Sequence, residues 1–202
     1  QALQYGEPDE VHWYETQWLK RLRQIQARQY KTAFLKESPR TTLERFSIST
    51  GLLDRTKFYN HRHHNSHAAA GYYTSKFNEA DVLVIDSIGE FETLTIWNGV
   101  GNNLKKVFSQ GYPNSVGLWY SAMTQRIGLK PNEDEYILMG WAAVGDPEKY
   151  KQRILDDFFY PFSETDPTIR FKQNLHRGCL WWAPELNTVQ DYADIAAATP
   201  AV

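Results

Sequence analysis

The spacing of apolar residues divides the 202-residue chain into expected strands and helices. Period-two alternation, or a short run of β-branched residues, predicts strands over 11–15, 81–87, 91–97, 104–110 and 168–175. A period near that of the α-helix predicts helices over 17–34 and 115–128. Small and aromatic residues over 63–74, an apolar segment over 134–145 and cap residues before 146–159 and 189–199 predict four more. The run DVLVIDS at 81–87 is apolar enough to predict a buried strand.

Cap residues indicate where several of these helices begin and end. Asp146 is expected to cap the helix over 146–159, with Pro147 at its first helical position. The last helix is expected to be capped by Asn187 or Thr188. Glycines are expected to end two helices, at 128 and 145.

Turn residues separate the other elements. The stretch NGVGNN at 98–103 predicts the turn of a hairpin between the strands over 91–97 and 104–110. Residues 38–42 break the first helical pattern, and residues 1–10 are expected to form a turn or a tail. The chain has no internal repeat or low-complexity linker. The order of these elements therefore predicts a mixed fold of the α/β class, with a strand hairpin flanked by helices.

Composition and charge exclude several classes of protein. Apolar residues make up 42% of the chain and aromatic residues 14%, which is enough for a packed core. The net charge of −2 gives no basis for binding nucleic acid or a membrane surface, and the basic stretches 20–28 and 149–153 are expected to be solvated helix faces. No apolar run approaches the ~18 residues of a membrane span. A single cysteine, Cys179, excludes a disulfide within the chain, fits a reducing, cytoplasmic compartment and is expected to be a structural thiol.

The stretch HRHHNSH at 61–67 holds four of the six histidines and is the first candidate for chemistry. His63 and His67 are four residues apart, so on a helix both imidazoles face the same side. Asp86, expected at the end of the strand over 81–87, is the candidate carboxylate ligand. Such a set suits Fe²⁺, Zn²⁺ or Mn²⁺. His64 stands where the zinc-protease motif has a glutamate, which excludes that class of protease.

Residues 86–90 are expected to form a turn whose backbone N–H groups face a phosphate. Ser87, Gly89 and Glu90 are the candidate nucleotide-binding residues in it, and His64 and Glu90 are the candidate catalytic residues. Two other interpretations remain open. The histidines could form an exposed loop that binds nothing, or the chain could be a small metallohydrolase in which Glu90 is the general base.

Three stretches together resemble one family: HHNSHAAAGYYTSKF, VLVIDSIGEFETLTIWNGVG and YPNSVGLWYSAMTQRIGLKPNEDEYILMGWAAVGDP. In order and spacing they resemble the O-carbamoyltransferases of nodulation-factor and antibiotic biosynthesis. That family has His-His-x-x-His-Ala before a strand and Asp-Gly-x-Gly-Glu after it. The likeness covers about residues 60–147. The flanks VHWYETQWLKRL and QDYADIAAAT match the family more loosely.

The resemblance implies a large domain of the actin-like ATPase and sugar-kinase class that holds Fe²⁺ and nucleotide. A second domain of the family makes carbamoyl adenylate from carbamoyl phosphate and ATP. The large domain passes the carbamoyl group to the hydroxyl of a small-molecule acceptor. The family's metal ligands carry over onto His63, His67 and Asp86.

The chain departs from the family at several positions. Ser87 replaces a glycine, Asn114 a histidine and Ile137 a lysine, and residues 143–144 are Ala-Val in place of Pro-Tyr. The family's first phosphate-binding hairpin and its carbamoyl-adenylate domain have no counterpart here. Residues 1–202 are therefore expected to be a single partial domain that is inactive alone, that needs further segments or a partner chain, and that self-associates. The alternative is a non-catalytic binding or assembly module, in which Trp181 and Trp182 form a sugar or partner surface unless they pack in the core.

Overall fold

The computed structural model describes residues 8–26, 28–34, 41 and 56–202. The tail expected at 1–10 and the break expected at 38–42 therefore lie largely outside the described residues. Contacts between Cα atoms divide the chain into two compact units. The first comprises Gln1–Val84 and Gly89–Phe108, and the second Ile85–Ile88 and Ser109–Val202. The expectation that the whole chain forms one domain stays a prediction.

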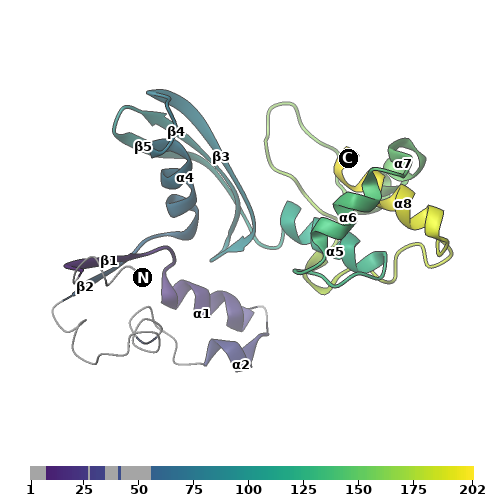
Figure 1. Ribbon diagram of the computed structural model, residues 1–202, viewed down its shortest axis with the longest axis horizontal. Coiled ribbons are helices and arrows are strands. Elements are labelled where there is room, and N and C mark those ends of the chain that lie inside the picture. Colours follow the sequence, from purple (N-terminus) through teal and green to yellow (C-terminus); the bar gives the residue numbers. More distant parts are fainter. Residues whose placement is uncertain (1–7, 27, 35–40, 42–55) are drawn as a thin grey trace. The chain divides into compact units, whose positions relative to one another are not determined.

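The first unit begins with a strand and two helices. Strand β1 (Glu10–Trp13) pairs in parallel with β2 (Lys57–Asn60), so that His12 lies opposite Tyr59. Helices α1 (Gln17–Gln26) and α2 (Tyr30–Ala33) follow β1 and lie against each other (Figure 1). The strand expected at 11–15 is confirmed, and the helix expected over 17–34 is divided into these two.

A three-stranded sheet with one covering helix forms most of the rest of the first unit, while Ile85–Ile88 of the sheet and its last residues, from Ser109, belong to the second unit. Its strands β3 (Glu79–Gly89), β4 (Glu92–Val100) and β5 (Asn103–Gly111) lie in the order β3–β4–β5. Two-residue connections join them, which is possible only for antiparallel neighbours. Helix α4 (His63–Tyr73) lies along one face of this sheet (Figure 1). The hairpin, its flanking helix and the mixed α/β class are confirmed.

Strand β3 is buried on one face only, the face on which α4 packs. Ala68 of α4 packs against Val84 of β3 and Trp97 of β4, and these three residues form a buried cluster between the helix and the sheet. Leu83 and Ile85, the alternate residues of β3, are 59% and 50% exposed. The strand predicted over DVLVIDS is confirmed, but its burial is not, because β3 buries only the face that α4 covers.

Close approach sets the spacing between α4 and β4. A Cβ atom on Gly99 would lie 2.5 Å from the ring of Tyr72, which is buried on α4. The Tyr72 hydroxyl donates to the carbonyl oxygen of Asn78 at 2.8 Å and to that of Gly101 at 3.0 Å. Residues 98–100, expected to be part of the turn, continue β4 instead. The turn consists of Gly101, with φ of 58°, and Asn102.

The second unit is helical and has an aromatic core. Its helices are α5 (Val116–Arg126), α6 (Glu135–Ala142), α7 (Pro147–Phe158) and α8 (Val189–Ala198), with short 3-10 helices η2 (Leu175–Arg177) and η3 (Thr199–Ala201). Trp119 of α5 lies 5.0 Å from Phe158 and 5.2 Å from Phe159, measured between ring centroids. Trp182 is buried in the same core and Trp181 is half exposed, so core packing explains Trp182.

Sequence signals at the ends of these helices were mostly right. The Asp146 side chain accepts from the N–H of Glu148 at α7, and Thr188, rather than Asn187, caps α8 in a capping box with Asp191. Gly128 follows α5 with φ of 85°. Gly145 does not end α6, which finishes at Ala142.

The structure also shows the roles of Gly145, of residues 168–175 and of Cys179 in this unit. A Cβ on Gly145 would lie 2.0 Å from the carbonyl oxygen of Ala193, so this glycine permits the close approach of α8. The strand expected at 168–175 is wrong: only a single antiparallel bridge, between Phe159 and Phe171, forms there. The Phe171 side chain instead fills the aromatic core. Burial raises the pKa of the Cys179 thiol to about 12, which supports the expected structural role.

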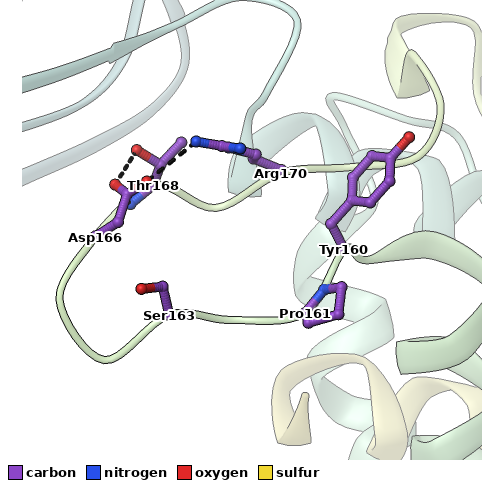
Figure 2. Close-up of a pocket in the computed structure, with 6 residues that line it drawn as sticks. All are labelled: Tyr160, Pro161, Ser163, Asp166, Thr168 and Arg170. Atoms are coloured by element: carbon purple, nitrogen blue, oxygen red, sulfur yellow. Dashed lines mark hydrogen bonds and ion pairs between the residues drawn. The ribbon is translucent and has the colours of Figure 1, made fainter.

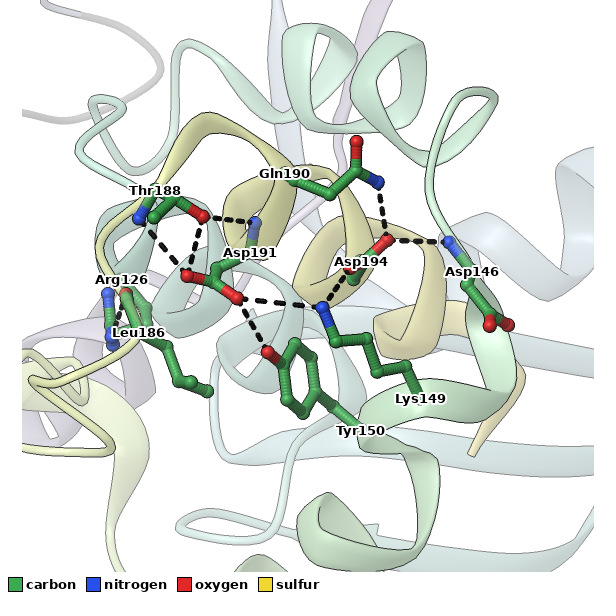
Figure 3. A network of polar contacts seen from close by, with 9 residues as sticks. All are labelled: Arg126, Asp146, Lys149, Tyr150, Leu186, Thr188, Gln190, Asp191 and Asp194. Carbon is green, nitrogen blue, oxygen red and sulfur yellow. Dashed lines mark hydrogen bonds and ion pairs between the residues drawn. The ribbon is translucent and has the colours of Figure 1, made fainter.

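A polar network ties the start of α7 to α8 (Figure 3). Lys149 Nζ lies 2.7 Å from Asp194 Oδ2 and 3.6 Å from Asp191 Oδ1. Burial disfavours the charge of Asp194, but hydrogen bonds from Lys149, the N–H of Asp146 and Gln190 outweigh it and lower its pKa. Hydrogen bonds from Thr188 and then Tyr150 lower the pKa of Asp191 to about 2. Lys149 is thus ion-paired, and its side chain is still 42% exposed, as expected for the solvated helix face of its basic stretch.

We expect Gly99→Ala to destabilise the protein by about 1–3 kcal/mol, because the added methyl group meets a ring that two hydrogen bonds hold in place. Gly71→Ala on α4 is the matched control. Its Cβ would meet only Val82, at 3.9 Å, and alanine favours the helix by up to about 1 kcal/mol. Urea unfolding of both variants tests this. Equal stabilities would contradict the close approach of α4.

We expect Asp191→Asn to flatten the loss of stability in acid. The lowered pKa of Asp191 stabilises the folded state above the usual aspartate pKa of about 3.9, and this contribution is lost as the pH falls towards about 2. Thermal unfolding between these two pH values measures the slope. The exposed Glu164→Gln variant is the control and should keep the wild-type slope. If the stability of Asp191→Asn fell with pH as steeply as that of the wild type, the network would not contribute to the pH dependence of stability.

Candidate metal centre

Helix α4 places two histidines of the HRHHNSH stretch on one face. The helix begins at His63, and His67 follows one turn later. The two Nε2 atoms lie 3.0 Å apart, and the rings meet edge to face with centroids 4.7 Å apart. His63 is partly buried and His67 is exposed. The helix expected at 63–74 is thus confirmed, and the spacing of four brings the two imidazoles together as predicted.

Asp86 brings a carboxylate to the same place. One oxygen of Asp86 and one ring nitrogen from each of His63 and His67 all lie within 4.8 Å of one another. Asp86 lies in the uninterrupted strand β3, between Val84 and Gly89 of the first unit, so the strand itself carries its carboxylate. Asp86 Oδ1 accepts the N–H of Ser87 at 2.6 Å, which orients the group.

The geometry of the histidine pair fits ligands of a single ion. With metal–nitrogen bonds of about 2.1 Å, the 3.0 Å separation subtends an angle of about 90° at the ion. Two cis histidines and one carboxylate leave further coordination positions for water or for substrate oxygens. This donor set suits Fe²⁺, Zn²⁺ and Mn²⁺ alike.

His64 points into the packed interior between α4 and the sheet, away from this pair. It is fully buried, and its Nδ1 lies 2.9 Å from the hydroxyl oxygen of Thr95 on β4. The same hydroxyl oxygen accepts from Nε1 of Trp97 at 2.8 Å. The catalytic role expected for His64 stays a prediction. Its contacts hold α4 on the sheet.

Gly89 is needed where β3 passes the start of α4. A Cβ atom there would lie 2.5 Å from Cδ2 of His63 and 2.6 Å from Cδ2 of His64. Residues 86–89 belong to β3, so the expected turn over 86–90 is wrong. The turn consists of Glu90, with φ of 61°, and Phe91. Packing against α4, rather than freedom in a turn, explains this glycine, and the nucleotide-binding role of Ser87 and Gly89 stays a prediction.

Glu90 is buried at that turn and connects it to α1. Its carboxylate accepts the N–H of Thr16, the residue before the helix, where a negative charge is favoured. Tyr14, also from the segment between β1 and α1, meets His63 edge to face with ring centroids 5.5 Å apart. This segment therefore supports the candidate metal centre from a second side. The catalytic and nucleotide-binding roles expected for Glu90 stay predictions.

Comparison with known families gives a match over most of the chain. The family described as carbamoyltransferase N-terminus matches residues 10–195. The chain belongs to this family. The resemblance carried by the three sequence stretches is thereby confirmed at the level of the family.

Individual relatives of this carbamoyltransferase family match over a shorter length. The chain is 47% identical over 95 residues to an uncharacterised protein of Synechocystis, covering 47% of this chain and 15% of that protein. It is 33% identical over 90 residues to the nodulation protein NolO of Bradyrhizobium diazoefficiens (45% and 16%). The identity to the nodulation protein NolNO of Sinorhizobium fredii is 32% over 97 residues (48% and 14%). The match thus spans about a sixth or less of the length of these relatives.

Within the described part of the chain, no helix is long and apolar enough to cross a membrane. A hollow of about 340 Å³ in the second unit carries no comparable site (Figure 2). Asp166 there accepts from Thr168 and from Nη2 of Arg170, the latter at 3.1 Å, so the two charges in this loop offset each other. The cluster of His63, His67 and Asp86 is the better candidate, because its three possible ligand atoms lie within 4.8 Å of one another.

Sequence reasoning missed three residues around this centre: Tyr14, Thr95 and Ser115. Ser115 caps α5 by accepting from the N–H of Leu118, and its hydroxyl donates to the carbonyl oxygen of Ser87 at 2.6 Å. Its place before a helical pattern is a cap signal that points to it. Asn114, where the family has histidine, accepts the N–H of Phe171 at 3.0 Å and so has a structural contact. Tyr14 and Thr95 carry no local signal, because pairing across the chain brings them to α4.

We expect Thr95→Val to destabilise the protein by about 1–3 kcal/mol, because His64 and Trp97 both lose a buried hydrogen-bond partner. Thr95→Ser is the matched control. It keeps the hydroxyl and loses one methyl group, at a cost of about 0.8 kcal/mol. Chemical denaturation of both variants measures the difference. If the valine variant were as stable as the serine variant, the hydroxyl would not be what holds His64 in place.

Proposed function

We propose that this chain supplies the metal-binding part of an O-carbamoyltransferase, which transfers a carbamoyl group to the hydroxyl of a small-molecule acceptor. The convergence of His63, His67 and Asp86 in a chain of the carbamoyltransferase N-terminus family is the observation that supports this proposal most. The fold class we propose for the complete domain is the actin-like ATPase and sugar-kinase type.

The three ligands fit a divalent ion, for which we propose Fe²⁺, with Zn²⁺ and Mn²⁺ as alternatives. A bound ion would offset negative charge that develops on carbonyl or phosphate oxygens of the carbamoyl donor. Asp86 would offset part of the ion's charge. The N–H of Ser87 holds one oxygen of this carboxylate, so the group needs little reorientation.

The neighbouring residues orient the ligands. His64, fixed by Thr95, holds the first turn of α4 against the sheet, and Gly89 lets that turn approach β3. The ring of Tyr14 limits the movement of His63. Exposed His67 lies on the side open to solvent, from which a donor and a hydroxylated acceptor would approach.

The donor in this proposal is carbamoyl adenylate, which another part of the complete enzyme makes from carbamoyl phosphate and ATP. We also propose that Ser87, Gly89 and Glu90 lie close to the nucleotide, since they follow the ligand Asp86 on β3 and its turn. The exposed apolar residues Leu83 and Ile85 on β3 support the expected contact with further segments of the carbamoyltransferase or with a second chain.

We expect His67→Ala to lower the affinity for Fe²⁺, measured anaerobically by calorimetry, by more than about 100-fold. That exceeds the 10- to 100-fold cost of losing a group that only orients a ligand. His176→Ala, which removes a histidine of the second unit, is the matched control and should bind as the wild type does. An affinity unchanged by His67→Ala would exclude this centre.

Carbamoyl transfer tests the reaction itself. The protein in its full-length form is supplied with ATP, carbamoyl phosphate and hydroxylated acceptors, and carbamoylated product is measured. His67→Ala should abolish transfer and His176→Ala should not. Intact metal binding without transfer to any acceptor would favour the non-catalytic binding module instead.

A further inference from the structure

A second pair of histidines lies on the small parallel sheet of the first unit. His12 is in β1, and His61 directly follows β2. Parallel pairing aligns the two strands, and the N–H of His61 continues it by donating to the carbonyl oxygen of Trp13 at 2.9 Å. His12 Nδ1 then lies 2.8 Å from His61 Nε2. The pair is thus set by backbone register and not by side-chain contact alone.

Glu10 determines which nitrogen of His12 is available. Its Oε2 lies 3.2 Å from Nε2 of His12, so Nε2 carries the proton that it donates to this carboxylate. The lone pair of the neutral ring is therefore on Nδ1, the atom that faces His61. A histidine that ligates a metal commonly donates its other ring N–H to a carboxylate in this way. The Tyr59 ring stacks on His12 with centroids 5.0 Å apart and limits rotation of the imidazole.

We propose that His12 and His61 form a second metal site, which takes a borderline divalent ion such as Zn²⁺ through Nδ1 of His12 and Nε2 of His61. Tetrahedral ligands with bonds of about 2.1 Å have nitrogens roughly 3.4 Å apart, so the pair must open by about half an ångström. His61, whose Nε2 donates to Nδ1 of His12, must also shift to the tautomer with its proton on Nδ1, so that Nε2 can bind the ion in place of this hydrogen bond. The side chains of His12 and Glu10 are 53% and 46% exposed, which leaves room for this movement and for water to complete the coordination.

The ligand types separate this site from the candidate metal centre. The second site has two imidazoles and no carboxylate ligand, because Glu10 contacts the nitrogen of His12 that faces away from the ion. Imidazole suits Zn²⁺, Ni²⁺ and Cu²⁺, whereas Mn²⁺ prefers oxygen ligands and binds nitrogen sites most weakly of this series. Zn²⁺ should therefore fill both sites, and Mn²⁺ only the one that contains Asp86.

Equilibrium dialysis against Zn²⁺, with bound metal measured per chain, tests the proposal. We expect two ions in the wild type and in His176→Ala, one in His12→Ala, one in His67→Ala and none in the double variant His12→Ala/His67→Ala. A count in His12→Ala equal to that of the wild type would overturn the second site. The His67→Ala result reports on the candidate centre separately, so either site can fail without the other.

Glu10→Gln provides a test that keeps both histidines in place. We expect two bound Zn²⁺ ions. The affinity of the site formed by His12 and His61 should fall by about 10- to 100-fold, because the amide orients the imidazole less strongly than the carboxylate. This variant decides the question if His12→Ala disturbs the pairing of β1 with β2. Unchanged affinities at both sites would show that Glu10 and His12 do not act as a unit and would overturn the proposal.

Discussion

The first unit depends on how closely helix α4 approaches its sheet. At two positions, Gly89 and Gly99, a single additional carbon atom would collide with a side chain of the helix. The contact runs the length of α4, from His63 and His64 at its start to Tyr72 at its end. Small residues at such a contact bring the backbones together, and this distance fixes where every other side chain of the helix points.

Because α4 lies so close to the sheet, His64 is buried, whereas its neighbours His63 and His67 on the same helix are not fully buried. Successive residues of a helix point about 100° apart, so His64 faces the sheet while His63 and His67 share another side. Burial makes an unpaired ring nitrogen costly, and the hydroxyl of Thr95 offsets that cost by serving both His64 and Trp97. His63 and His67 instead meet each other, with their Nε2 atoms 3.0 Å apart, beside the carboxylate of Asp86.

Much of this arrangement could be predicted from local signals. The helix with His63 and His67 one turn apart, the hairpin and the caps at Asp146 and Thr188 all depend on residues within a few positions of one another. The strand expected at 168–175 does not form, because only Phe159, the residue that follows α7, pairs with this segment, through one bridge at Phe171. The turn begins later than the expected 86–90, at Glu90, because Gly89 belongs to β3 and serves packing against α4.

Contacts between distant segments explain what the sequence could not indicate. Thr16 meets Glu90 across 74 positions, and Tyr14 reaches His63 because β1 pairs with β2. Neither alternation nor helical period carries information about such pairs. The departure of Ser87 from the family's glycine also becomes explicable, since it lies within β3, where a strand accepts a side chain that a tight turn would not.

The two histidine pairs differ mainly in what the nearest carboxylate does. Asp86 lies among the ligand atoms themselves, while Glu10 lies behind its histidine and acts through the ring. A carboxylate in direct contact neutralises charge and broadens the range of ions towards Mn²⁺, whereas one behind the ring only raises the basicity of the imidazole. In a chain with both arrangements, ions that prefer oxygen ligands would bind only at the candidate metal centre on α4, and zinc would bind at both sites. The ion that occupies the candidate catalytic centre would then depend on which metals are in supply, because its three ligands alone do not select one.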